Sequence, residues 1–111
     1  MRVVVVGSDR AELVALFRSA GVDGVGLASP SVADLAGVDC LVGFRWPAGV
    51  SSPVPWVHVT GLGLDGFAGA PRPGLMTRTV GTMPTQMGRY VVGAVASFAE
   101  RHRELAAAQL R

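Results

Sequence analysis

The stretch RVVVVGSDRAELVALFRSAG, residues 2–21, decides the fold. Its first part, over 2–7, is a run of β-branched residues long enough for a buried parallel strand. Its second part has the apolar spacing of one helix face. Ser8 or Asp9 can cap the start of that helix, and Gly21 can end it. A strand that runs directly into a helix is the typical opening unit of an α/β fold.

The same alternation continues along the chain. Four further apolar runs predict strands, at 24–28, 39–44, 54–60 and 75–80. Residues 31–37 predict a short helix, and from Pro84 the pattern becomes one long amphipathic helix over 84–110. Alternating strands and helices joined by right-handed crossovers favour a parallel sheet of flavodoxin-like order. The sequence therefore predicts a single α/β domain over 1–111: a doubly wound, flavodoxin-like parallel sheet of five strands with a long C-terminal helix.

Composition excludes several classes of protein. Half of the 111 residues are hydrophobic and 16% are charged, which is not typical of a disordered chain. No apolar run approaches the ~20 residues of a membrane span. The arginines near the end of the chain alternate with glutamates, so they form no basic patch for nucleic acid. Cys40 is the only cysteine, which favours the reducing cytoplasm.

The stretch VTGLGLDGF, residues 59–67, contains the glycine spacing of a dinucleotide-binding turn at Gly61, Gly63 and Gly66. That site also needs a full helix after the third glycine and an acidic residue about 20 residues further on. The following FAGAPRPG has room for little more than a turn, and the next acidic residue after Asp65 is Glu100. We therefore predict that this motif binds no dinucleotide.

Two segments carry a resemblance to a known family. VPWVHVTGLGLDGF, residues 54–67, resembles the W-(I/V)-x-x-x-G-A-G-(V/I)-D segment in the substrate-binding half of D-isomer-specific 2-hydroxyacid dehydrogenases. GTMPTQMGRYVVGAVASFAERHREL, residues 81–105, resembles the next conserved segment of that family. The order and spacing of the two segments match as well, so the resemblance spans nearly the whole chain.

The resemblance implies a small carboxylate ligand, a 2-hydroxy or 2-keto acid, held by the backbone N–H groups of the glycine loop. Glycine allows close backbone approach, and successive N–H groups form an anion-binding concavity. Arg45 and Trp46 follow the third predicted strand and lie at the same edge of the sheet. Arg45 can pair with a carboxylate, and Trp46 can form the wall of a pocket. Packing of the loop is the alternative role for both. The candidate substrate-binding residues are Thr60, Gly61, Leu62, Gly63, Arg45 and Trp46.

In the resembled family a Rossmann domain supplies NAD(P) and the catalytic Arg, Glu and His. No residue here matches that trio, so we expect no catalytic residue, no cofactor site and no activity from this chain alone. His58 is interpreted as a packed or surface residue and Cys40 as a small core residue, and no metal site is predicted. One hypothesis is a stand-alone or truncated substrate-binding domain that works with a separate Rossmann-domain protein. The other is a non-catalytic dimeric binding or scaffold module.

The helix predicted over 84–110 carries a wide apolar stripe. Residues Met87, Val91, Val95 and Phe98 belong to it. One side of a small sheet cannot bury so wide a stripe, and soluble monomers rarely leave such a surface in water. In the resembled family the equivalent helix packs across the subunit interface. We therefore expect a homodimer formed through this helix.

Overall fold

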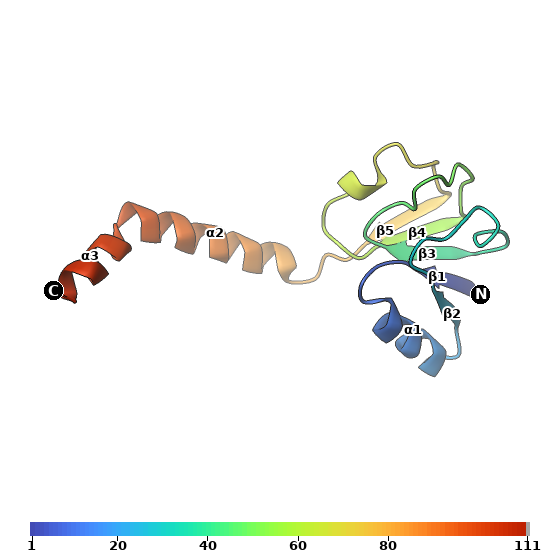
Figure 1. Ribbon diagram of the computed structural model, residues 1–111, viewed down its shortest axis with the longest axis horizontal. Coiled ribbons are helices and arrows are strands. Elements are labelled where there is room, and N and C mark those ends of the chain that lie inside the picture. The colour runs from blue at the N-terminus through green and yellow to red at the C-terminus, as the bar shows by residue number, and fades with distance from the viewer. Residues whose placement is uncertain (111) are drawn as a thin grey trace. The chain divides into compact units, whose positions relative to one another are not determined.

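The computed structural model describes residues 1–110, apart from the side chains of Met83 and His102. The chain divides into two compact units, Met1–Thr79 and Val80–Arg111. The first unit is built on a five-stranded sheet in which every pair of neighbouring strands is parallel, and the strand order is β2-β1-β3-β4-β5 (Figure 1). The α/β class and the five-stranded parallel sheet are therefore confirmed. The strands are β1 (Arg2–Val5), β2 (Asp23–Gly26), β3 (Cys40–Gly43), β4 (Trp56–Val59) and β5 (Leu75–Arg78).

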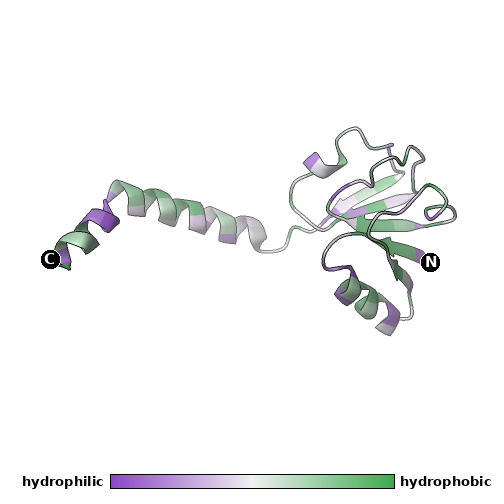
Figure 2. Ribbon diagram, viewed as in Figure 1, coloured by the Kyte–Doolittle hydropathy of each residue, from purple (hydrophilic) through white to green (hydrophobic). Residues whose placement is uncertain are grey.

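The alternation of side chains along the strands produces two buried layers, one on each face of the sheet. On one face, Val3 and Val5 pack with Val14 of the helix that follows β1. On the other face, Val4 belongs to a cluster that is closed by residues of the connecting segments, including Phe67. Both layers consist of hydrophobic side chains, and Figure 2 colours much of the sheet as hydrophobic. This burial on both faces explains why the strands read as continuous apolar runs.

Helix α1 (Arg10–Ser19) forms where the sequence predicts it, and Gly21, at φ 77°, follows its end. The expected capping by Ser8 or Asp9 is wrong. Asp9 occupies the N-cap position without a side-chain hydrogen bond to the helix, and the Ser8 hydroxyl donates to the Asp9 carboxylate at 3.1 Å instead. The N–H groups of the first turn therefore stay available at the carboxyl edge of the sheet.

Residues 32–37 form turns, where the sequence predicts a short helix over 31–37. The first turn is capped as a helix start would be: the Ser31 N–H and hydroxyl both donate to the Asp34 carboxylate at 2.7 Å. The chain then reaches Gly37, which has a φ of 70°. A capped turn that meets a left-handed glycine so soon has no room to propagate into a helix.

The second unit contains α2 (Met83–Ala99) and α3 (His102–Gln109), two helices where the sequence predicts one over 84–110. The break is at Arg101, which has the left-handed backbone angles φ 53° and ψ 40°. The Arg101 N–H donates to the Phe98 carbonyl at 3.1 Å, a bond typical of a residue that ends a helix in this conformation. Of the helices described, none is both long and apolar enough to cross a membrane.

Candidate functional site

All five strands run in the same direction, so their carboxyl ends meet at one edge of the sheet. The chain leaves β1 toward β2 on one side and comes back to β3 on the other, and this change of direction opens a crevice between β1 and β3. Gly7 is the second residue after β1 and has a φ of 133°, a backbone conformation that other residues rarely adopt. There the chain turns from the sheet into α1.

The larger crevice at this edge has a volume of about 450 Å³. Its walls come from the segments that follow β1, β2 and β3. The two charged side chains among the described residues that line it are Arg10 and Arg45. Arg10 donates from Nη1 to the Gly7 carbonyl at 2.7 Å, which fixes the guanidinium at the rim. Arg45 is exposed and has no hydrogen bond or ion pair with the described part of the chain. The crevice therefore has a positive lining.

A smaller crevice of about 160 Å³ adjoins it on the α1 side. Phe44, Gly7 and Arg10 line both crevices, and Thr60 contributes the end of β4 to the smaller one. Asp9 also lines the smaller crevice. Its carboxylate makes this part less suitable for an anion than the larger crevice.

Trp46 combines the two roles that the sequence left open. Its indole Nε1–H donates to the Val50 carbonyl at 2.8 Å, and its ring meets Phe67 edge-on at a centroid distance of 6.5 Å. These contacts hold the loop after β3 against the core. The same indole forms part of the wall of the larger crevice, so the wall is rigid.

The glycines of the 59–67 stretch serve close packing of two loops. An added Cβ atom at Gly61 would come within 2.4 Å of the Phe44 ring, and one at Gly66 within 2.4 Å of the Phe44 carbonyl oxygen. The Gly66 carbonyl also accepts a hydrogen bond from the Trp46 N–H at 2.9 Å. This loop therefore needs glycine in order to lie directly on the segment that follows β3.

This packing does not suit a nicotinamide dinucleotide. Gly66 packs against the loop after β3 and lies within η1 (Asp65–Phe67), a 3-10 helix of three residues. A pyrophosphate site would need the open amino end of a full helix at this point.

The N–H groups of Gly61, Leu62 and Gly63 have no acceptor within the described part of the chain. Arg78, at the end of β5, donates from Nη1 to the Leu62 carbonyl at 2.9 Å and holds the loop from the other side. These three loop residues line neither crevice, whereas Thr60, Arg45 and Trp46 do. The predicted residues thus share the edge of the sheet without forming one pocket.

Four residues that line both crevices are not among the candidate residues drawn from the sequence: Val6, Gly7, Arg10 and Phe44. A signal for Gly7 and Arg10 was present, because both follow the first strand at the carboxyl edge. Phe44 carries the same signal, because it ends the third predicted strand at this edge, but its place in the wall depends on the packing of the glycine loop against it.

His58 lies on the α1 face of the sheet, away from the crevices. Its Nδ1 is 2.8 Å from the Thr77 hydroxyl, which also accepts a 2.8 Å hydrogen bond from Trp56 Nε1–H. The other ring nitrogen of His58, Nε2, lies 3.3 Å from the Thr79 hydroxyl. The imidazole is engaged by both ring nitrogens, so it holds β4 to β5.

Cys40 lies in the buried layer beneath this network. The pKa of its thiol is raised to about 11, chiefly by burial and to a smaller extent by the charge of Asp39, against a hydrogen bond from the His58 backbone that lowers it. A neutral buried thiol is a poor nucleophile. The described side chains contain no group of three or more His, Cys, Asp or Glu that could hold a metal ion.

Comparisons with models of known protein families, with curated proteins and with solved structures found no match to this chain.

Proposed function

We propose that the first unit of this chain binds a small carboxylate, such as a 2-hydroxy or 2-keto acid, in the crevice between β1 and β3. The observation that carries this proposal is the lining of the crevice. It has two arginines, Arg10 and Arg45, and no acidic side chain among the described residues that form its walls. Such a lining attracts an anion and disfavours a cation.

The topology supports the same location. The strand order β2-β1-β3-β4-β5 is the order of flavodoxin-like sheets, and we propose that the first unit is of this type. Ligands of open parallel sheets bind outside the carboxyl ends of the strands, where the order of strands reverses. The crevice lies at that point, between the segments that follow β1 and β3.

The chemistry of the lining residues suits a carboxylate. Arg45 has its N–H groups free to form a two-pronged hydrogen bond with the two oxygens. Arg10 uses one N–H on Gly7 and keeps others for a ligand. The first-turn N–H groups of α1, left without a side-chain cap, add a positive partial charge. Phe44 and Trp46 would pack against the apolar part of the ligand.

We further propose that this module acts as the substrate-binding half of an oxidoreductase related to D-2-hydroxyacid dehydrogenases. The resemblance of 54–67 and 81–105 to that family supports this. A hydride step needs NAD(P) and a proton-transferring side chain, and His58 is engaged in the sheet by both ring nitrogens. A separate Rossmann-domain protein would supply both. The free, buried Cys40 supports a reducing compartment such as the cytoplasm.

A second candidate is a binding or scaffold module without catalysis. The observation that favours it is that the charged lining residues of the larger crevice are arginines, which remain protonated and transfer no proton. A neighbouring gene for a Rossmann-domain protein would favour the oxidoreductase role. Turnover of a keto acid when both proteins and NADH are mixed would separate the two candidates.

Isothermal titration of the chain with glyoxylate and pyruvate tests the proposal. We expect binding, and we expect Arg45→Gln to weaken it roughly 10- to 100-fold, the usual worth of a charge-assisted pair. Arg72→Gln is the matched control, because Arg72 is also exposed but lines neither crevice. Equal affinity in all three proteins would contradict the proposal.

NADH should not bind, and micromolar affinity for it would refute the assignment of the glycine loop to packing.

A further inference from the structure

The crevice between β1 and β3 is much larger than the smallest carboxylates that fit it. Its volume of about 450 Å³ is that of roughly 15 water molecules, at about 30 Å³ for each one. Pyruvate and lactate have only a few heavy atoms, so either acid would leave most of this space to water. Specific sites bury most of the surface of their ligand. The space therefore favours a carboxylate that carries a large side chain.

The walls of the crevice determine the polarity of that side chain. Apart from the two arginines and the Ser29 hydroxyl, the described lining residues are glycine and apolar residues. The indole N–H of Trp46 is already donated to the Val50 carbonyl. A polar side chain of the ligand would lose its hydration here and find few hydrogen-bond partners in exchange. The walls therefore favour an apolar side chain.

Phe44 gives this apolar wall a flat aromatic surface. It is 57% exposed, although its side chain lies where two loops pack against each other. The ring lies against Gly61, where an added Cβ atom would come within 2.4 Å of it, and it also lines the crevice. The glycine loop thus supports the ring from one side and leaves it open to the crevice. An open ring of this kind can stack on another aromatic ring.

The charges around the crevice favour a ligand with a single carboxylate. Arg10 and Arg45 line the larger crevice, whereas the adjoining smaller crevice contains the Asp9 carboxylate. A second anionic group on the α1 side would approach Asp9 and be repelled by it. A dicarboxylate or a phosphate ester meets this repulsion, and an uncharged aromatic side chain avoids it.

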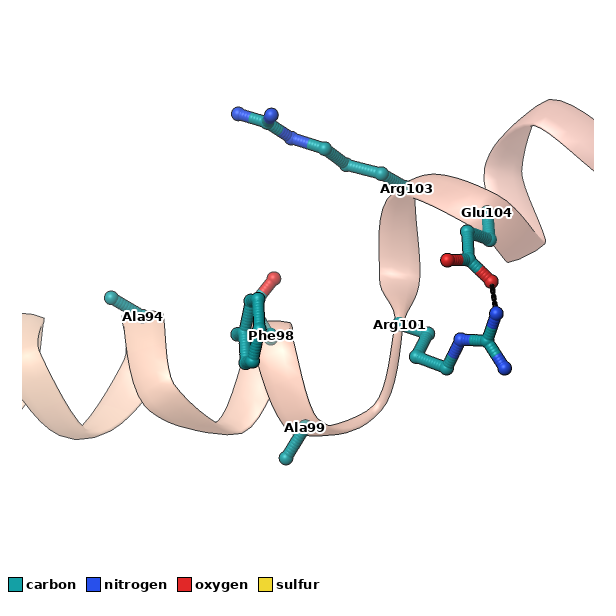
Figure 3. A pocket seen from close by; sticks show the side chains of 7 residues that line it. Ala94, Phe98, Ala99, Arg101, Arg103 and Glu104 are labelled. Atoms are coloured by element: carbon teal, nitrogen blue, oxygen red, sulfur yellow. Dashed lines mark ion pairs between the residues drawn. The ribbon is translucent and has the colours of Figure 1, made fainter.

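A hollow at the bend between α2 and α3 also combines an aromatic ring with arginines. It has a volume of about 780 Å³, and Figure 3 shows Phe98, Arg101 and Glu104 among its lining residues. The Arg101 guanidinium is paired there with the Glu104 carboxylate. A ligand carboxylate would have to compete with this ion pair. The crevice between β1 and β3, which has no acidic side chain among its described lining residues, is the better site for an aromatic acid.

We propose that the ligand of the crevice is an aryl-substituted 2-hydroxy or 2-keto acid with a single carboxylate. The carboxylate binds Arg45 and Arg10, and the aromatic ring packs against Phe44 and the apolar wall. Phe44 selects the side chain of the ligand, and Gly61 positions Phe44. This inference rests on the proposed carboxylate site and adds to it the class of acid that the site takes.

Isothermal titration with D-lactate, D-phenyllactate and D-malate tests the class of acid. These three 2-hydroxy acids differ only in the group on the methyl carbon, which is hydrogen, phenyl or a second carboxylate. We expect phenyllactate to bind roughly 10- to 100-fold more tightly than lactate, because its ring is buried in the crevice. Malate should gain no such advantage. Arg45→Gln should weaken lactate and phenyllactate by a similar factor, because both use the same carboxylate contact.

Variants of the first unit test the role of Phe44. Phe44→Ala should reduce the preference for phenyllactate over lactate by roughly 5- to 20-fold. Gly61→Ala displaces the ring and should reduce the same preference, so it keeps the test decisive if Phe44→Ala fails to fold. Leu75→Ala is the matched control, because Leu75 is 52% exposed and lines neither crevice. Tryptophan fluorescence shows whether each variant is folded, since Trp46 and Trp56 both lie in the first unit.

Failure of this inference and failure of the carboxylate site give different results. If lactate binds and is weakened by Arg45→Gln, but phenyllactate or malate shows the wrong order, the carboxylate site stands and the aryl class is wrong. An unchanged preference in folded Phe44→Ala or Gly61→Ala would also overturn the inference. If none of the three acids binds to the unmodified chain, the carboxylate site and the inference both fail.

Discussion

The α-carbon of Gly66 lies against the backbone of Phe44, so closely that an added Cβ atom would stand 2.4 Å from the Phe44 carbonyl oxygen. The Trp46 N–H donates to the Gly66 carbonyl beside this contact, at 2.9 Å. Together these contacts dock the glycine loop on the segment that follows β3. That segment carries Phe44, Arg45 and Trp46 into the larger crevice, so the glycine loop supports the proposed binding site.

Alanine substitutions at Gly61, Gly63 and Gly66 should lower the free energy of unfolding by different amounts. Gly66→Ala should destabilise most, by about 1–3 kcal/mol, because the backbone of Phe44 must move. Gly61→Ala should cost less, since it meets an exposed ring that can turn away. Gly63→Ala meets only the Asp65 carboxylate and should stay within about 0.5 kcal/mol. Urea unfolding followed by tryptophan fluorescence measures all three, and a cost at Gly63 equal to that at Gly66 would contradict the packing role.

The sheet could be predicted from the sequence because the central strands β1, β3 and β4 lie in short apolar runs bounded by turn residues. The absence of a helix at 31–37 could not be predicted, because Ser31 and Asp34 form the hydrogen bond of a helix start. The helix does not continue because Gly37 has a left-handed backbone angle. The break at Arg101 has no glycine or proline to mark it. Chain connectivity predicted the edge of the sheet that carries the site. The crevice itself depends on the contact of Phe44 with Gly66, more than 20 residues away, which no spacing reveals.

Cys40 should make stability depend on pH in the alkaline range. Burial raises the pKa of its thiol from 9.0 to about 11, so the unfolded chain loses this proton first as the pH rises. The stability from the neutral thiol is complete below about pH 9 and is lost as the pH rises toward 11. Cys40→Ala should reduce this decrease of the unfolding free energy with rising pH, whatever its effect on stability at pH 7. Urea unfolding between pH 7 and 11 tests this, and identical slopes in both proteins would argue against it.

Thr77 should be the key residue of the contact between β4 and β5. Thr77→Val leaves the Trp56 indole N–H and the His58 Nδ1 without their shared partner, at an expected cost of about 1–3 kcal/mol. Thr79→Val is the matched control, because its bond to His58 is longer, at 3.3 Å, and exposed. Thermal unfolding of the two variants should show the larger loss for Thr77→Val, and the reverse order would contradict the network.

Arg101 should tolerate glycine better than a branched residue. The left-handed backbone costs a residue with a side chain roughly 1–2 kcal/mol, a cost that glycine avoids. We expect Arg101→Gly to keep or raise the helix content seen by far-ultraviolet circular dichroism, although it removes the ion pair with Glu104. Arg101→Val should favour a continuous helix or destabilise this unit. If both variants behave alike, the bend does not depend on this backbone conformation.

Amide chemical shifts during titration with glyoxylate test the proposed carboxylate site most directly. We predict progressive changes, saturating with ligand, at the amides of Gly7, Arg10, Phe44, Arg45 and Trp46, with smaller changes at the ends of β4 and β5. The same titration of Arg45→Gln should give weak changes that do not saturate. Changes concentrated on another part of the first unit, or no change at millimolar glyoxylate, would contradict the assignment of the crevice between β1 and β3 as the binding site.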